Sequence, residues 1–182
     1  MGNQAGIIIR NVKNELFQSA NRLILNEVKG IECLLFNINM KIIETGFEGL
    51  YILETINFQD ERGRFQKMFN SDFFRENGLD TDFKEFYFSV NNKGVRRGMH
   101  FQIPPFEHTK LVYVRILDVC VDIRRQSPTY GKCFSIELDD TKAQYLYIPK
   151  GFAHGFLSLE DGSIVNYAQT SCYNRECDCG IL

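Results

Sequence analysis

The feature that most constrains the fold is a series of short apolar runs separated by turn signals across residues 40–182. Runs of β-branched and aromatic residues bounded by Gly, Pro and Asp are typical of strands joined by tight turns. The expected strands cover 85–91, 99–102, 109–115, 117–124, 133–138, 144–148, 155–159 and 163–170. Many short strands at this spacing predict an all-β sandwich, jelly roll or barrel.

Two segments differ from this pattern. One short helix is expected at 71–78, where Ser71 or Asp72 could cap the start and Gly78 could form the end. Residues 1–39 contain apolar positions near helical spacing but no recognisable chemistry. We therefore divide the chain into an N-terminal extension of unknown role at 1–39 and one domain at 40–182.

Composition narrows the class of protein. Hydrophobic residues make up 44% and aromatic residues 13%, which favours a folded domain over a disordered chain. The net charge of −2 argues against non-specific nucleic-acid binding. No apolar run is long enough to span a bilayer, and the N-terminus lacks a secretory pattern. We expect a cytoplasmic protein that binds neither nucleic acid nor membrane.

The six cysteines are expected to be reduced thiols in that compartment. Three of them, Cys172, Cys177 and Cys179, gather near the end of the chain and raise the alternative of a zinc site. Their C-x-C spacing and the lack of a nearby His fit structural zinc poorly. The preferred interpretation is that they are simply small residues near the end of the chain.

Only three histidines are present, and two of them stand beside glycines at expected strand edges. These two, His100 and His154, are suited to proton transfer near neutral pH, although an isolated His is more often structural. Strict strand alternation does not place Arg97 beside His100, so spacing alone leaves the geometry of a pocket open.

Several runs occur in an order that resembles one enzyme family. They are Asp60-Glu61-Arg62-Gly63-Arg64-Phe65, Lys93-Gly94-Val95-Arg96-Arg97-Gly98-Met99-His100-Phe101-Gln102, Lys110-Leu111-Val112, Asp118-Val119-Cys120-Val121-Asp122-Ile123-Arg124, Ser127-Pro128-Thr129-Tyr130-Gly131-Lys132 and Ile148-Pro149-Lys150-Gly151-Phe152-Ala153-His154-Gly155-Phe156. Together they resemble the dTDP-4-dehydrorhamnose 3,5-epimerases over about residues 40–181. The resemblance implies a double-stranded β-helix (a cupin jelly roll) with a few short helices, and a homodimer that uses no metal or redox cofactor.

The resemblance also implies roles for particular residues in epimerising a nucleotide-linked 4-keto-6-deoxyhexose. The implied catalytic residues are His100 as base, Tyr167 as acid and Lys110 as stabiliser of the oxyanion. The implied substrate-binding residues are Arg62, Phe65, Glu85, Tyr87, Arg97, Gln102, His154 and Tyr173. Arg62 is expected to reach in from the partner subunit.

Plainer interpretations stand beside these roles. Arg62 follows Asp60 and Glu61, so it could form an ordinary surface ion pair. Tyr167 and Tyr173 could be packing residues, and Asp118 is expected to support a strand rather than do chemistry. A metal-dependent cupin is the rival enzyme class, but Gln102 stands where the second His of an H-x-H metal pair would be.

The chain also departs from the family pattern. Glu85 and Tyr87 stand where the family commonly has Gln and Asn, and Lys67 stands where it commonly has Glu, which raises a different nucleotide sugar as an alternative. The segment 114–117 looks too short for the family's hairpin turn. The family's aspartate partner for the catalytic His has no counterpart before Leu182, which raises a catalytically impaired sugar-nucleotide-binding relic as a further alternative.

Overall fold

The structure, a computed structural model, describes residues 40–55, 57–105, 107–113, 115–139 and 141–181. The expected N-terminal extension at 1–39 lies outside the described residues. Within them, thirteen strands and two short helical segments follow one another along the chain. They are β1 Lys41–Glu44, β2 Tyr51–Glu54, β3 Asn57–Asp60, β4 Gly63–Gln66, α2 Ser71–Glu76, β5 Glu85–Asn91, β6 Arg96–Gln102, β7 Lys110–Tyr113, β8 Ile116–Asp122, β9 Cys133–Leu138, β10 Gln144–Ile148, β11 Phe152–Ser158, β12 Ser163–Gln169, the 3-10 turn η1 Arg175–Cys177 and β13 Asp178–Gly180.

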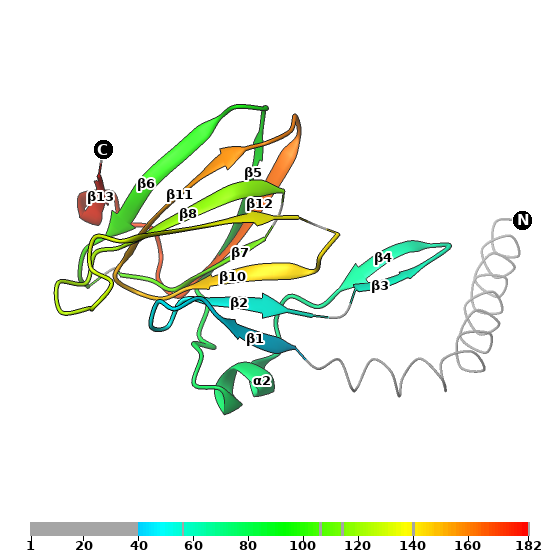
Figure 1. The fold of residues 1–182 in the computed structure, drawn as a ribbon, viewed down its shortest axis with the longest axis horizontal. Coiled ribbons are helices and arrows are strands. Elements are labelled where there is room, and N and C mark those ends of the chain that lie inside the picture. The colour runs from blue at the N-terminus through cyan, green and yellow to red at the C-terminus, as the bar shows by residue number, and fades with distance from the viewer. Residues whose placement is uncertain (1–39, 56, 106, 114, 140, 182) are drawn as a thin grey trace, which may run out of the picture. The chain divides into compact units, whose positions relative to one another are not determined.

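Two antiparallel sheets form the body of the domain, and Figure 1 shows them facing each other. One sheet has six strands in the order β1-β2-β10-β7-β12-β5, and the other has five in the order β13-β6-β11-β8-β9. The strands β3 and β4 form a separate hairpin that projects from the two sheets (Figure 1). This architecture confirms the predicted all-β cupin jelly roll.

The core fills the space between the two sheets. Its members come from both, which is why their strands alternate between buried and exposed positions. The fully buried set includes Val112, Ile116, Leu138, Leu146 and Val165. This core fixes the spacing of the two sheets, and the functional residues described below occupy the open part of the same space.

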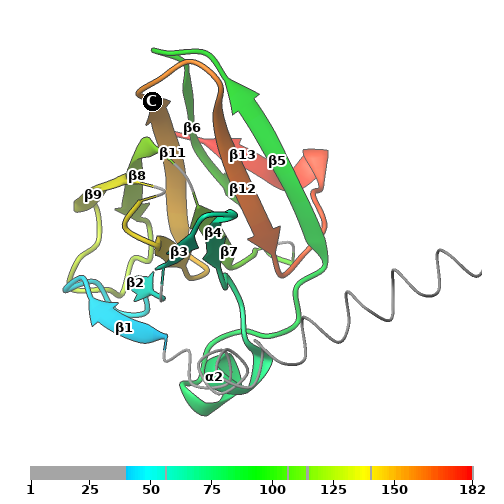
Figure 2. The same cartoon turned by 90° about the vertical axis from the view of Figure 1, so that its right-hand side faces the viewer.

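The strand β10 is buried on both faces, which explains its unbroken apolar sequence. Leu146 and Ile148 point into the core between the sheets. Tyr145 and Tyr147 point the opposite way, into a second apolar cluster that includes Phe74 of α2. The helix α2 therefore packs against the outer face of the six-stranded sheet. It lies at the bottom of Figure 2.

The start of α2 corrects one expectation. Neither Ser71 nor Asp72 caps the helix; the cap is Asn70, whose side-chain oxygen accepts hydrogen bonds from the backbone N–H groups of Asp72 and Phe73, both at 3.0 Å. Asn is as good an N-cap as Ser or Asp because its carbonyl oxygen reaches the same unpaired N–H groups.

The short connection near residue 115 is also different from the expectation. The strands β7 and β8 do not form a hairpin, because β7 pairs with β10 and β12 while β8 pairs with β9 and β11 in the other sheet. A chain that crosses from one sheet to the other needs only a bend. The apparent shortening at 114–117 therefore does not require a distorted hairpin turn.

A buried carboxylate braces the loop that follows β8. Asp122 is 0% exposed and accepts hydrogen bonds from the Arg124 guanidinium, the Ser127 hydroxyl at 2.6 Å and the Thr129 hydroxyl at 2.6 Å. These donors hold the pKa of the Asp122 carboxyl well below its usual range, against the opposing effect of burial. Asp122 thus has a structural role, as expected from the sequence.

Replacing Asp122 with Asn is expected to lower the free energy of unfolding at pH 7 by about 2–4 kcal/mol, since an amide leaves several of these donors without a negative partner. Because the folded-state pKa is depressed, this stabilisation is present above the unfolded pKa of about 3.9 and is lost as the pH falls through the folded value. Denaturant unfolding at several pH values should show a gap between wild type and variant that is constant above about pH 5 and narrows in acid. The control Asp82→Asn removes an exposed carboxylate paired with Lys84 and should change little.

Candidate functional site

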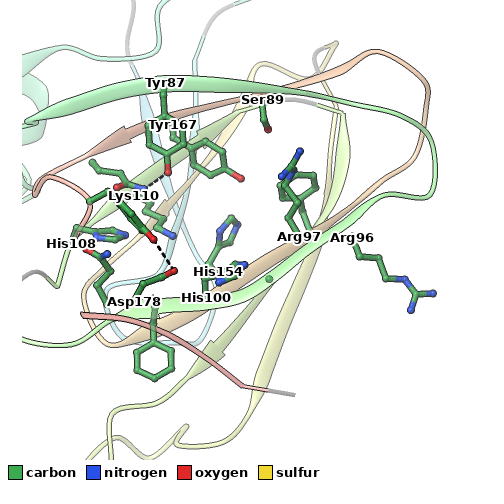
Figure 3. A pocket seen from close by; sticks show the side chains of 16 residues that line it. Tyr87, Ser89, Arg96, Arg97, His100, His108, Lys110, His154, Tyr167 and Asp178 are labelled. Atoms are coloured by element: carbon green, nitrogen blue, oxygen red, sulfur yellow. Dashed lines mark hydrogen bonds between the residues drawn. The ribbon is translucent and has the colours of Figure 1, made fainter. Parts of the chain in front are cut away.

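A cavity of about 520 Å³ opens between the two sheets. One wall is formed by β5, β7 and β12 of the six-stranded sheet, and the other by β6, β11 and β13 of the five-stranded sheet. Figure 3 shows the side chains that converge there. The lining includes most of the residues predicted for the site, namely Tyr87, Arg97, His100, Gln102, Lys110, His154, Tyr167 and Tyr173.

A bulge in β6 brings Arg97 and His100 to the same wall. His154 lies opposite His100, but Phe156 lies opposite Arg97, so β6 has one residue more than β11 over this stretch. That extra residue cancels the alternation that would have separated positions 97 and 100. Gly98 and Gly155 face each other at the bulge, and a Cβ on Gly98 would lie 2.4 Å from the Gly155 Cα. The close approach requires both glycines.

His100 projects into the cavity from the centre of β6 (Figure 3). Among the described residues, no carboxylate forms a hydrogen bond or ion pair with its ring. The imidazole is therefore open to a ligand, and the aspartate partner expected from the family resemblance is not seen in this part of the chain.

His154 is held by a carboxylate that lies behind the cavity wall. Its Nε2 is 2.8 Å from the Asp118 Oδ2, and the two side chains are 4% and 0% exposed. An ionised carboxylate can only accept, so Nε2 carries the hydrogen and Nδ1 is left for a ligand. The expectation that Asp118 serves only its strand was incomplete, because this residue fixes the orientation and tautomer of His154.

Lys110, a half-buried residue, contributes its amine to the same cavity from the first position of β7. Burial lowers the pKa of this amine, and the nearby Cys120, Asp118 and Asp178 partly offset the effect. A desolvated ammonium group interacts strongly with a negative oxygen because little water screens it.

Tyr167 faces His100 from the opposite sheet. It lies on β12, its ring packs edge-on against His154 at 6.0 Å between centroids, and burial followed by the charge of Asp118 raises the pKa of its phenol. The phenol is therefore protonated at neutral pH and can act as a proton donor. A base on one wall and an acid on the other can act on opposite faces of a ring held between them.

The charge of the cavity suits an anionic ligand. Its lining carries Arg96, Arg97 and Lys110, and Asp178 is the one carboxylate among the described lining residues. Arg97 is oriented by the buried Asn91, whose Oδ1 accepts a 2.8 Å hydrogen bond from the Arg97 Nε. The rest of the guanidinium is left for a group such as a diphosphate, which its planar fork can bind through two oxygens.

Tyr87 lines the cavity beside Tyr167. The two residues are opposite each other in the β5–β12 register, and their rings stack with centroids 4.9 Å apart. The Tyr87 hydroxyl accepts a hydrogen bond from the Gln169 Nε2. Desolvation, with the charges of Glu85 and Asp178, raises the pKa of Tyr87 to about 12.

The segment after β12 closes one end of the cavity. The Tyr173 hydroxyl donates to the Asp178 Oδ2 at 3.4 Å, and the Tyr173 backbone N–H donates to the Glu85 Oε2 at 3.2 Å. Glu85 itself lies at the mouth, in a hollow shared with Phe86, Tyr87 and Tyr173, and does not line the main cavity.

Gln102 lines the cavity, but its amide is engaged elsewhere. Its Nε2 donates to the Asn174 carbonyl at 2.8 Å and its Oε1 accepts from the Asn174 N–H at 3.3 Å. The side chain therefore fastens the segment after β12 to β6, and the predicted contact with substrate is not evident from these bonds.

Arg62 and Phe65 are not brought to this cavity within one chain. Both belong to the projecting β3–β4 hairpin, where Phe65 is 49% exposed and the Arg62 guanidinium pairs with Asp60. The local ion pair agrees with the plainer interpretation of Arg62, and it holds the pKa of the Asp60 carboxyl below its usual value.

Several residues that line the cavity or hold a lining residue were not predicted as site residues from the sequence: Asp118, Asn91, Gln169, Asp178 and His108. A signal existed for Asp118, because β8 alternates Ile116, Asp118, Cys120 and Asp122 on its buried face. A carboxylate at a core position requires a partner. No comparable signal marked the others. The contact of Gln169 with Tyr87 depends on the pairing of β12 with β5, and Asp178 reaches the cavity through the pairing of β13 with β6.

The described part of the chain also bears on the metal, zinc and membrane alternatives. Within it, no group of three or more His, Cys, Asp or Glu side chains is arranged to hold a metal ion. Cys120, Cys133, Cys172, Cys177 and Cys179 are free thiols. No helix among the described residues has the length and apolar character needed to cross a membrane.

Comparisons with known proteins agree on one family. The family model described as dTDP-4-dehydrorhamnose 3,5-epimerase matches residues 44–182. A dTDP-4-dehydrorhamnose 3,5-epimerase from Methanothermobacter thermautotrophicus is 42% identical over 143 residues, which cover 78% of this chain and 77% of the relative.

Solved structures are similar over the same region. The dTDP-4-dehydrorhamnose 3,5-epimerase of Bacillus anthracis, with TDP and PPi bound, has a TM-score of 0.75 and 37% identity, covering 79% of this chain and 85% of that one. A dTDP-6-deoxy-D-glucose-3,5-epimerase of Legionella pneumophila in complex with dTDP-4-keto-L-rhamnose has a TM-score of 0.74 and 37% identity, covering 79% and 78%.

Proposed function

This chain belongs to the dTDP-4-dehydrorhamnose 3,5-epimerase family, and we propose that it inverts C3, C5 or both centres of a dTDP-linked 4-keto-6-deoxyhexose. The enzyme is an isomerase that removes a proton from carbon and returns one on the opposite face. The reaction serves the synthesis of L-rhamnose or a related deoxysugar. The observation that carries the assignment is the placement of His100 and Tyr167 on opposite walls of one cationic cavity.

The chemistry follows from acidity next to a ketone. A C–H bond adjacent to the C4 carbonyl loses its proton to the His100 imidazole, and the electron pair moves to the carbonyl oxygen as an enolate. Lys110 stabilises that oxyanion from a desolvated position. The Tyr167 phenol then protonates the same carbon from the other face. Substrate and product have the same oxidation state, so the sequence of steps needs no redox cofactor.

The ends of the substrate are assigned by charge. Arg97 and His154 bind the diphosphate or the sugar, and Tyr173, with Glu85 near the mouth, contacts the nucleoside or sugar end. Tyr87, whose ring stacks on Tyr167, acts through that residue. Gln102 acts indirectly, by holding the segment after β12 against β6 through its hydrogen bonds to Asn174. The proposed location of the enzyme is the cytoplasm, as expected from the sequence.

Deuterium exchange tests the function. The protein is incubated in D2O with dTDP-4-keto-6-deoxyglucose, and incorporation at C3 and C5 is followed by NMR. Incorporation together with the inverted product is the expected result. No exchange at high enzyme concentration, with dTDP still raising the melting temperature, would support the binding relic instead. Exchange with another nucleotide sugar alone would favour the different-substrate alternative, which Glu85 and Tyr87 at the cavity mouth make worth testing.

The proposed functional unit is a homodimer built on the edge strand β5. Tyr87 and Ser89 point into the cavity, whereas Phe86, Phe88 and Val90 point outward and are 71%, 64% and 58% exposed. An apolar face along an open sheet edge, beside a groove lined by Met68, Phe69 and Phe83, suits a second copy of the chain. In such a dimer the projecting hairpin can carry Arg62 and Phe65 to the partner's cavity.

Replacing Phe88 with Glu is expected to convert the dimer to a monomer at micromolar concentration, because it puts a charge into the apolar contact. Sedimentation velocity measures the result. The matched control Tyr130→Glu changes a residue that is 54% exposed on the connection between β8 and β9, away from β5, and should leave the dimer intact. A wild-type chain that sediments as a monomer, or a Phe88→Glu variant that remains dimeric, would contradict the proposed interface.

A further inference from the structure

We propose that Tyr87 is a positioning residue whose ring holds Tyr167 in the orientation from which it delivers its proton. The inference rests on the proposed role of Tyr167 as the acid. It adds to that role a second aromatic side chain, from the neighbouring strand, that does not itself exchange a proton with the substrate.

The contact is built into the sheet. Tyr87 on β5 is directly opposite Tyr167 on β12, and the strands pair without a break from Asn91 and Ser163 to Glu85 and Gln169. Both side chains point into the cavity, and their rings stack at 4.9 Å with planes 25° apart. Aromatic residues directly opposite each other on one face of a sheet attract each other, and offset stacking is one of their preferred arrangements.

Tyr87 is itself fixed at its far end. Its hydroxyl accepts a hydrogen bond from Gln169, a residue that is 3% exposed and is two positions beyond Tyr167 on the same face of β12. The Tyr87 ring therefore crosses from its own strand over Tyr167 and is attached to β12 beyond it. It can restrict the movement of Tyr167 because it is held at both ends.

A second fixed group also contacts the Tyr167 ring. The His154 ring packs edge-on at 6.0 Å with the planes 77° apart, and Asp118 holds that ring. The phenol thus has a stacked neighbour and an edge-on neighbour, each restrained by its own hydrogen bond. Pre-orientation of this kind matters because a misplacement of about 1 Å can cost about 100-fold in rate.

The chemistry of the Tyr87 side chain fits a supporting role. Its own raised pKa keeps the phenol neutral, so it adds no negative charge near the diphosphate. Burial, followed by the charge of Asp118, raises the pKa of the Tyr167 phenol as well, so both stacked phenols are neutral at neutral pH. The ring supplies the contact, and the hydroxyl anchors the ring.

Two substitutions separate the ring from its hydroxyl. Tyr87→Ala removes the stack and is expected to lower kcat for epimerisation by about 10-fold or more with KM changed by less than about threefold. Tyr87→Phe keeps the stack and loses only the hydrogen bond from Gln169, so it should lower kcat by less than Tyr87→Ala does, by about threefold at most, with KM changed by less than about threefold. Circular dichroism and thermal melting confirm that both variants are folded.

The decisive measurement is the ratio of deuterium exchange to inversion in D2O. Loss of acid positioning leaves the base able to remove and return a proton on its own face, so Tyr87→Ala should raise this ratio while Tyr87→Phe does not. A general loss of stability would lower exchange and inversion together. An unchanged ratio in Tyr87→Ala, or equal defects in Ala and Phe variants, would overturn the inference.

A separate readout distinguishes this inference from the proposed function. If the wild-type chain shows no exchange, the proposed function fails, and the Tyr167 ring is then followed by NMR in protein carrying ¹³C-labelled tyrosine. Slow ring flipping in wild type and Tyr87→Phe, with fast averaging in Tyr87→Ala, would support the positioning contact. Equal flipping rates in the three proteins would overturn it.

Discussion

Replacing His100 with Asn is expected to lower the rate of deuterium exchange at the carbons next to the ketone by about 10³-fold, within the range that a general base contributes. The substitution keeps a polar side chain of similar size but removes the group that accepts the proton. Exchange and inversion should fall together, because both begin with the same proton abstraction. The measurement is NMR of the sugar protons in D2O, with enzyme concentration varied to reach slow rates.

Two controls distinguish loss of the base from loss of binding or of folding. The affinity for dTDP, measured by calorimetry, should change by less than about fivefold in His100→Asn, because the variant keeps Arg97 and His154, the residues proposed to bind the diphosphate or the sugar. The melting temperature should also stay close to that of wild type, since the His100 ring has no hydrogen bond to a carboxylate among the described residues. A variant that retains a tenth of the wild-type exchange rate would show that another group is the base.

Replacing Tyr167 with Phe is expected to separate the two halves of the reaction. Epimerisation should fall by about 100-fold or more because the phenol that delivers the proton to the second face is lost. Exchange at the same carbon should continue at a much higher rate than inversion, since His100 can return deuterium to the face from which it removed the proton. The readouts are deuterium content and stereochemistry of the recovered sugar.

The Tyr167 substitution also has a structural check. Phe keeps the ring that stacks on Tyr87 and meets His154, so thermal stability should change by a few degrees at most. The high pKa of the phenol predicts that wild-type inversion does not decline from its ionisation below pH 9. If Tyr167→Phe inverted the sugar as fast as wild type, the proton donor would have to be sought elsewhere on the β12 wall.

Much of the fold could be predicted because its signals are local. The strands at Glu85–Asn91, Cys133–Leu138 and Gln144–Ile148 have the predicted bounds, since turn residues and apolar alternation mark both ends. The short strand Asp178–Gly180 was missed because it is formed by pairing with β6 rather than by its own composition. The connection at Arg115 was misjudged because sheet membership cannot be inferred from loop length.

The sequence predicted which residues form the site better than it predicted how they are arranged. The resemblance supplied His100, Lys110, His154 and Tyr167, and the structure brings all four to one cavity. It could not supply the β6 bulge at Gly98, because register depends on the partner strand. The pairing of Asp118 with His154 likewise depends on a contact between residues 36 positions apart.

His100 and Tyr167, the proposed base and acid, are carried by different sheets, so their separation bears on how faithfully the enzyme controls stereochemistry. The gap between His100 and Tyr167 is set by the side chains that keep the sheets apart, including Ile116, Val165 and Phe156. A smaller side chain there would let the sheets approach or shear without touching either reacting group. Stereochemical fidelity is therefore a property of the core, and drift in the product ratio should precede loss of the fold.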